Sequence, residues 1–339
     1  MNVFHGYDQL ITIRDIAKRA NVSSATVSRV LNDSSPVKEE KRAAVLEAMK
    51  ALDFQPNLFA RGLASGESRT IGIAVQMSGS SFYNLVSDGV SASLEELGYS
   101  PIYSNRKHRP GIGLAAITTL INRRVDGLIL MGGDVSAREL KEIRNTMPTI
   151  VVGRDISGRT EETVYIDNFK PAYELTKVLI EAGHRRIAHI SGNQKHYDGR
   201  QRLEGYQQAL KDHGIQPSEE LIYEGDFSSQ SGVIGVNSLL SRGINFSAVF
   251  AGNDPCAYGV RLALYQKGIR VPDDVSIVGF DDQRESAYMT PPLTTVHQPA
   301  RELGEAAGKA IVALARGEPF EPPEFVAEIV HRDSVRRRV

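Results

Sequence analysis

A run of hydroxyl and other short side chains, with one arginine among them, stands near the amino terminus. It reads NVSSATVSRVLND and extends from Asn21 to Asp33. Serine and threonine hydroxyls can bond phosphate oxygens, and an arginine can bond the edge of a guanine through two hydrogen bonds. The run therefore suits contact with a nucleic acid, although the solvated face of a small helical subdomain can have the same composition.

Two short helices are predicted to carry this run. Thr12 can cap a first helix, and Asp15 three residues later completes a capping box. Apolar residues at helical spacing follow, namely Ile13, Ile16, Ala17 and Ala20. Ser23 can cap a second helix, which we expect from Ser24 to about Leu31. Two helices joined by so short a turn form a helix-turn-helix, whose second helix enters the major groove of DNA.

The contacts of this head with DNA are expected at the second helix and at the two caps. A third helix fits residues 39–52. Residues 1–66 contain nine lysines and arginines against seven acidic residues, so charge gives this prediction little support. The predicted DNA-binding residues of the head are Thr12, Ser23, Ser24, Ala25, Thr26, Ser28, Arg29 and Asn32.

The whole amino-terminal segment resembles the DNA-binding head of the LacI family of bacterial transcription regulators. The matching stretches are TIRDIAKRANVSSATVSRVLN, LDFQPN and NLFARGLA. The resemblance implies a helix-turn-helix domain in residues 1–56 and a hinge helix in residues 57–68, which pairs in a dimer and enters the minor groove. Leu63 stands at the position of the leucine wedged between two base pairs. The other hinge residues expected at the DNA are Asn57, Ala60 and Arg61.

From Thr70 onward, short apolar runs alternate with segments of helical period. Runs such as TIGIAV, VDGLILMG and SAVFAGND are typical of strands, and residues 82–97, 171–182 and 201–213 are typical of helices. This alternation indicates parallel sheets covered on both faces by helices. We therefore predict an all-α head followed by an α/β region, residues 69–339, that forms two doubly wound parallel-sheet lobes.

Polar and aromatic residues gather where the predicted strands end. Ligands of doubly wound sheets bind beyond the carboxyl ends of the strands. Aromatic faces can cover a sugar ring, and planar charged groups can each bond two neighbouring hydroxyls. Taken singly, each residue is explained as well by capping or a surface ion pair, but together they predict a cleft for a polyhydroxylated ligand. The predicted residues are Phe82, Tyr83, Arg154, His196, Asp198, Arg202, Phe227, Asn253 and Asp281.

The family resemblance continues through this region, in VYIDN, GHRRIAHISG, RLEGY, NDPCAYG and VPDDVSIVGFDD. It implies an effector-binding and dimerisation core similar to periplasmic sugar-binding proteins. Arg202, Asn253 and Asp281 match the ligand-contacting positions of the family, and the aromatic residues and Asp198 match more loosely. Arg154 stands where many sugar-responsive members have a carboxylate or an amide. The charge of the effector therefore stays open, with a neutral sugar preferred over an acidic one.

Motifs for other chemistry are weak. GIGLAA, residues 111–116, matches a dinucleotide fingerprint, but NRKHRP separates it from the preceding strand, which is the second of its lobe. No P-loop, HExxH or GxSxG occurs, so we expect no enzyme, no cofactor and no metal. The single cysteine, Cys256, excludes an internal disulfide and is expected to be buried. No apolar run approaches the roughly 20 residues of a membrane span, and the amino terminus lacks a signal peptide, so we expect a cytoplasmic protein.

The sequence thus predicts a homodimeric transcriptional regulator, most simply a repressor. Its partners are expected to be a near-palindromic double-stranded DNA operator and a small-molecule effector, with a sugar preferred. A purine or nucleoside effector is the first alternative, because Tyr83 and Phe227 could stack on a base. A sugar-binding protein without DNA function is the second. The identity of the effector, the target operon and the direction of the response are not encoded in any motif.

Overall fold

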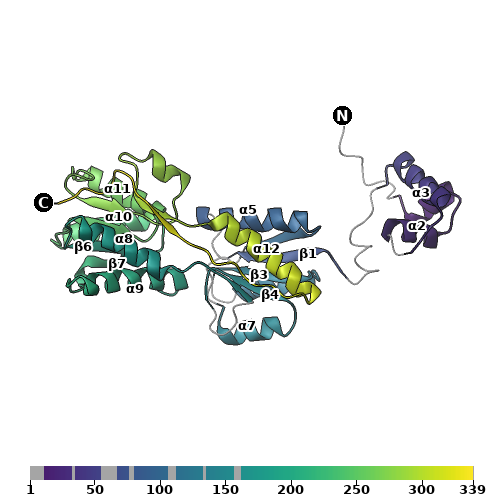
Figure 1. The fold of residues 1–339 in the computed structure, drawn as a ribbon, viewed down its shortest axis with the longest axis horizontal. Helices are drawn as coiled ribbons and strands as arrows, with labels where there is room; N and C mark the ends of the chain where they lie inside the picture. Colours follow the sequence, from purple (N-terminus) through teal and green to yellow (C-terminus); the bar gives the residue numbers. More distant parts are fainter. Residues whose placement is uncertain are drawn as a thin grey trace. The chain divides into compact units, whose positions relative to one another are not determined.

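The computed structural model contains two compact units, residues 1–68 and residues 69–339. We call the first unit the head and the second the core (Figure 1). The structure describes residues 11–32, 35–54, 67–75, 80–105, 112–132, 135–155 and 162–338.

The described part of the head folds into three helices around a small apolar centre. They are α1 (Ile13–Arg19), α2 (Ser24–Asn32) and α3 (Glu39–Ala51). Ile16, Val27 and Val45 are fully buried where the three helices meet. Ile13, the first residue of α1, belongs to the predicted apolar stripe but is 36% exposed and lies outside this centre.

The first lobe of the core is built on a five-stranded parallel sheet. The spatial order of its strands is β2-β1-β3-β4-β5. The chain therefore places β2 on one side of β1 and then continues with β3 on the other side. This is the order of a doubly wound sheet. The strands are β1 (Thr70–Val75), β2 (Ser100–Asn105), β3 (Gly127–Met131), β4 (Thr149–Val152) and β5 (Thr163–Val164).

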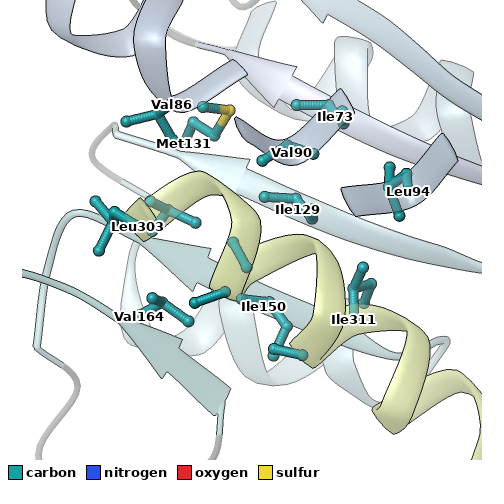
Figure 2. Packing of buried hydrophobic residues seen from close by; sticks show 14 of the residues in the cluster. Ile73, Val86, Val90, Leu94, Ile129, Met131, Ile150, Val164, Leu303 and Ile311 are labelled. Atoms are coloured by element: carbon teal, nitrogen blue, oxygen red, sulfur yellow. The ribbon is translucent and has the colours of Figure 1, made fainter. Parts of the chain in front are cut away.

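Four helices cover this sheet, two on each face. They are α5 (Ser81–Glu96), α6 (Ile112–Asn122), α7 (Ala137–Arg144) and α12 (Ala300–Arg316). Figure 2 shows Ile73, Ile129 and Ile150 of the strands under α5 and α12. Alternate strand residues such as Leu130 face α6 and α7. Helices α5 and α12 approach each other so closely that only glycine fits at position 304: a Cβ there would lie 2.0 Å from the carbonyl oxygen of Val86.

The second lobe repeats this architecture with a four-stranded parallel sheet in the order β7-β6-β8-β9. The strands are β6 (Ile187–Ser191), β7 (Ile222–Glu224), β8 (Ala248–Ala251) and β9 (Ser276–Val278). One face is covered by α8 (Phe169–Glu181) and α9 (Tyr197–Asp212), the other by α10 (Ser229–Ser241) and α11 (Asp254–Gln266). Two short 3₁₀ helices, η2 (Glu219–Leu221) and η3 (Arg284–Tyr288), complete the lobe.

The chain passes between the lobes three times. It leaves the first lobe after β5, returns to it before α12, and leaves it again after α12 (Figure 1). The second and third passages are flanked by the antiparallel ribbon of β10 (Thr295–His297) and β11 (Glu328–Val330). The predicted fold class, a helical head followed by two doubly wound lobes, is confirmed. No helix in the described ranges is both long and apolar enough to span a membrane.

Candidate functional site

Each of the first two helices begins at one of the predicted caps. The Asp15 carboxylate accepts the backbone N–H and the hydroxyl of Thr12, at 2.8 and 2.6 Å. The Ser23 hydroxyl accepts the backbone N–H of Thr26 at 3.2 Å, and the hydroxyls of these two residues lie 2.9 Å apart. Asn21 closes the turn at φ +49°, a left-handed conformation that asparagine tolerates. Sequence reasoning located both caps.

The outer face of α2 carries short polar side chains. Ser23, Ser24, Ala25 and Arg29 are exposed, whereas Val27 is fully buried beneath them. Thr26 and Ser28 lie half-buried at the border of this face, and Asn32 is the last residue of α2. We call this outer face, from Ser23 to Arg29, the α2 face. Its exposed Ser23 and Ser24 hydroxyls and its Arg29 guanidinium are groups that can bond a phosphate or a base edge.

The predicted hinge residues lie outside the described ranges. They are Asn57, Ala60, Arg61 and Leu63.

Arg202, on α9, lies at the centre of the polar groups in the core. Its Nε donates to Oδ1 of Asn168 at 2.9 Å, and its Nη1 donates to the carbonyl oxygen of Gly252 at 2.7 Å. Its Nη2 donates to Oδ1 of Asp281 at 3.3 Å. The guanidinium also lies 3.8 Å from the ring centroid of Phe280. The Arg202 and Asp281 side chains are each only 6% exposed, so this is a buried, nearly saturated ion pair.

Asp281 follows β9 and has an unusual backbone. Its φ is +106°, a region that costs a non-glycine residue about 1–3 kcal/mol and is concentrated at functional sites. Its Oδ1 also accepts a hydrogen bond from Nε2 of Gln298 at 2.7 Å. The pKa of Asp281 is raised to about 6, mainly by burial; the Arg202 charge lowers this pKa, and the nearby Asp198 charge adds to the increase. Strain, burial and a charge partner together identify Asp281 as a candidate binding residue.

An aromatic wall stands beside this ion pair. The ring of Phe227 lies 5.5 Å from the Arg202 guanidinium carbon. A Cβ on Gly192 would lie 1.9 Å from Cζ of Phe227, so only glycine fits there. Phe227 itself has φ +68°. The end of β6 and the loop before α10 therefore fix the position of this ring.

A small cavity lies between the strand ends of the two lobes. Tyr83, Gly132, Gly153 and Arg154 line it from the first lobe, and His196, Tyr197 and Asp198 line it from the second. It thus brings together four of the predicted site residues: Tyr83, Arg154, His196 and Asp198.

The groups around this cavity are mostly polar. Burial, together with Asp198 and Asp281, raises the pKa of the Tyr83 phenol, so the phenol stays neutral and can donate. Asp198 accepts the backbone N–H of Gly199 at 2.9 Å. Arg154 donates to the carbonyl oxygen of Val135 at 2.8 Å. Phe82 packs edge-to-face against Tyr83, with ring centroids 5.3 Å apart, so Phe82 supports the Tyr83 ring that lines the cavity.

The side-chain oxygen of Asn253 takes part in capping a helix. Its Oδ1 accepts the backbone N–H of Cys256 at 3.0 Å and caps α11. The next residue, Asp254, is fully buried and accepts the hydroxyls of Ser286 and Thr295 and the backbone N–H of Gln283. Burial raises the pKa of Asp254 to about 7, and Asp281 contributes in the same direction.

Several residues of the site were missed from the sequence. Asn168, Gln298, Phe280 and Tyr197 contact or flank the predicted residues. Asn168 ends the VYIDN stretch, and its polar type beside an apolar run is a usable signal. Gln298 follows β10, a strand too short to stand out in the sequence. Within the described residues, no group of histidine, cysteine or acidic side chains could hold a metal ion.

Known proteins resemble both units. Residues 12–57 match the lacI family of bacterial regulatory proteins, and residues 176–335 match the periplasmic binding protein-like domain. The ribose operon repressor of Escherichia coli (strain K12) is 36% identical over 300 residues, which cover 88% of this chain and 91% of the repressor. The HTH-type transcriptional repressor PurR of Klebsiella pneumoniae (strain 342) is 35% identical over 331 residues, which cover 96% of this chain and 97% of PurR.

The chain belongs to the LacI family. A solved structure agrees: the lac repressor dimer bound to operator and the anti-inducer ONPF has a TM-score of 0.87 and 28% identity, and the match covers 97% of this chain and 100% of that one. The resemblance inferred from the sequence is therefore confirmed, and this LacI-family protein is a DNA-binding transcriptional regulator. These relatives are regulators rather than enzymes.

Proposed function

We propose that this LacI-family protein is a homodimeric repressor whose affinity for a near-palindromic operator is controlled by a sugar. The observation that carries the proposal is the combination of an exposed α2 face on the head with a cleft of buried polar groups in the core. One site suits the phosphates and base edges of DNA, and the other suits a small molecule with many hydroxyls.

The head is proposed to dock α2 in the major groove, with Ser24, Ala25 and Ser28 against the backbone and bases. Arg29 lies one turn into the helix and is exposed, so it can reach a guanine bidentately. Thr12 and Ser23 precede the two helices and are exposed, and we propose that their hydroxyls bond phosphates.

Three functional segments are proposed: residues 1–56 as the DNA-binding domain, 57–68 as the hinge and 69–339 as the effector core. The compact units meet at residues 68 and 69, which supports the last of these limits. We propose that the effector acts through the hinge, because its cleft and the α2 face belong to different units. A repressor of this kind works in the cytoplasm, where its operator is found.

The proposed homodimer has candidate surfaces on both lobes. Strand β2 is an edge strand of its sheet, and an exposed edge needs a cover or a partner. Tyr103 on this edge and Leu85 and Leu114 on the flanking helices are between 39% and 44% exposed. The second lobe exposes Ile234, Leu262, Tyr265 and Tyr288. A two-fold interface can bury each of these surfaces against its copy.

The effector is proposed to contact the predicted cleft residues, with Arg202 and Asp281 at the centre. Carboxylate, phenol and imidazole groups at this cleft can each bond a sugar hydroxyl, and Phe227 can cover a ring face. We prefer a neutral sugar, because Asp198 and Asp281 repel an anion. A purine stacked on Phe227 and Tyr83 is the second candidate, since both rings are held at the cleft. No enzymatic step and no cofactor is part of this proposal.

The proposal is tested with the purified full-length protein. Operator sequences selected from a random DNA pool give the probe for mobility shifts at fixed salt, and a thermal-shift screen of sugars, sugar acids and nucleosides gives the effector class. We expect a two-fold symmetric footprint and a shift with a neutral sugar. An asymmetric footprint would contradict the dimer, and a shift with nucleosides alone would favour the purine.

A further inference from the structure

Residues 317–338, which we call the final segment, are divided into an acidic part and a basic part. Between positions 317 and 330 there are four glutamates and no lysine or arginine, whereas positions 336, 337 and 338 are all arginine. Figure 1 shows this segment returning from the end of α12 across the core to the second lobe. Near its middle, β11 is bonded to β10. The glutamates are Glu318, Glu321, Glu324 and Glu328.

The acidic part lies on the surface and carries uncompensated charge. Residues 318–327 form neither helix nor strand, and Phe320 and Phe325 anchor them, because both rings pack against the core of the first lobe. All four glutamates are exposed. Among the described residues, none of these four carboxylates has an ion-pair partner. Val326, which lies between them, is 64% exposed and adds apolar surface.

The basic part is fixed beside the amino end of β6. The N–H of Arg338 donates to the carbonyl oxygen of Ala182 at 2.7 Å, and a Cβ on Gly183 would lie 2.6 Å from the carbonyl oxygen of Arg338. The guanidinium groups of Arg185 and Arg338 donate only to backbone carbonyl oxygens, which carry no full charge. Arg337 is exposed, and within the described ranges it has no ion-pair partner. The charges of these three arginines are therefore uncompensated.

Other charges at this end of the second lobe are already neutralised. Each acidic side chain there lies in an ion pair with a lysine or an arginine, so these acids do not cancel the three arginines. The pairs are Lys177–Glu181, Arg186–Glu220, Arg270–Asp274 and Arg336–Asp273.

We propose that the acidic part binds the basic part of the final segment in a second copy of the chain, so that two of the proposed homodimers pair through these segments. Glu321 stands eight residues before Ile329 of β11, and Arg337 stands eight residues after it. When two final segments run antiparallel about a two-fold axis near β11, Glu321 of each copy faces Arg337 of the other. A two-fold contact of this kind is self-complementary.

The order of the charges favours a second copy over other partners. The acidic part repels the phosphates of a nucleic acid, and the basic part repels a uniformly basic protein. A second copy presents both charges in the complementary order. The pairing uses neither the α2 face nor the effector cleft, so it needs no operator and no effector.

Sedimentation of the purified full-length protein over a concentration series measures this pairing. The Debye length is about 20 Å at about 20 mM salt and about 4 Å at about 500 mM salt, so surface charges attract each other strongly only in the first condition. We expect a species at low salt with twice the mass of the high-salt species. A wild-type protein without this species at low salt would overturn the inference.

Two double variants remove the attraction from opposite sides. Glu321→Lys with Glu324→Lys places lysines against arginines, and Arg337→Glu with Arg338→Glu places glutamates against glutamates. Each should raise the Kd of the pair at low salt by at least about tenfold, because like charges then face each other. All four side chains are exposed, so both variants should fold. If one does not, the other must still lose the pairing, and retained pairing there would overturn the inference.

A mixture of the two double variants is the sharpest measurement. In a mixed pair, the new lysines face the new glutamates and the native glutamates face the native arginines, so an equimolar mixture should pair as wild type does. Glu204→Lys with Glu302→Lys, at exposed positions on α9 and α12, makes the same change in net charge elsewhere and should leave the pairing intact. A mixture that does not pair, or a control that loses the pairing, would refute the contact.

The high-salt mass separates this inference from the proposed homodimer. A monomer at high salt would count against that homodimer. The mixture of variants would still decide whether the final segments bind each other.

Discussion

In the head, the arginine proposed to bind DNA is exposed, whereas in the core the arginine at the centre of the cleft is buried and almost fully bonded. Arg29 on the α2 face is exposed, and Arg202 in the cleft has three protein acceptors and an aromatic neighbour. The same residue type thus serves two kinds of recognition. An exposed arginine is free to conform to a large, charged partner, while a buried one is fixed before a small ligand arrives.

The largest difference between the two regions is expected in stability. Arg202→Leu leaves Asp281 buried without its charge partner, which typically costs about 3–5 kcal/mol of unfolding free energy. The measurement is denaturant unfolding of the full-length protein. Arg200→Leu is the matched control, because Arg200 lies on the same helix and is exposed, and it should change stability by less than about 1 kcal/mol. Equal losses in both variants would contradict the comparison.

The buried carboxyls of the core should also make its stability depend on pH. The pKa of Asp254 rises from 3.8 to about 7 on folding, so the folded state holds a proton that the unfolded state releases. Stability from this group is therefore greatest below pH 4 and falls as the pH rises from about 4 to about 7. A shift of this size corresponds to about 4 kcal/mol at most.

Asp254→Asn isolates this contribution. The unfolding free energy of wild type minus that of the variant should decrease between pH 4 and pH 7, because asparagine does not titrate. Asp281 is present in both proteins, so its own pH dependence, which has the same sign and ends near pH 6, cancels in this difference. A difference that stays flat over this range would show that the Ser286 and Thr295 hydroxyls keep Asp254 ionised in the folded state.

The exposed arginine of the head should show the opposite behaviour. Arg29→Ala is expected to weaken binding to the cognate operator by about 1–3 kcal/mol and to leave the unfolding free energy unchanged within about 0.5 kcal/mol. Mobility shifts at fixed salt and thermal unfolding measure the two effects. Lys41→Ala, at an exposed position on α3, is the control for non-specific charge. Unchanged operator affinity in Arg29→Ala would remove this residue from the docking model.

The smallest effect is expected at the start of α2. Ser23→Ala removes the acceptor for the N–H of Thr26 and should cost the head about 0.5–2 kcal/mol. Ser23→Asp, which keeps a cap, should recover this stability but weaken operator binding, since it brings a negative charge toward phosphates. The two readouts are the melting of the head and the operator affinity. Loss of operator affinity in Ser23→Ala without loss of stability would mean that Ser23 contacts DNA directly.

The elements that follow local rules were predictable from the sequence. The caps at Thr12 and Ser23 depend on residues three positions apart, and the parallel strands appear as continuous apolar runs, so both can be read from short windows. Arg202 and Asp281 were found because ligands of doubly wound sheets collect at strand ends.

Contacts between separate segments were not predictable in the same way. Gln298 reaches Asp281 because the end of β10 lies beside the residue that follows β9, and no local pattern encodes such a contact. Asn253 was predicted to bind the effector because it stands at a strand end, and the sequence did not indicate that its side-chain oxygen caps α11. Ile13 has the right spacing, but the small centre of the head does not extend to it.

The packing of α12 against α5 has a consequence for the order in which the regulator becomes complete during synthesis. The first lobe begins at β1, but the helix that covers half of one sheet face spans Ala300–Arg316 near the end of the chain. Until those residues leave the ribosome, Ile73, Ile129 and Ile150 are covered by α5 alone and lack the part of their cover that α12 supplies. The three helices described in the head end by residue 51 and can fold early, whereas the first lobe must wait for nearly the whole chain. A nascent chain therefore carries a finished DNA-binding head well before it carries a finished sensor.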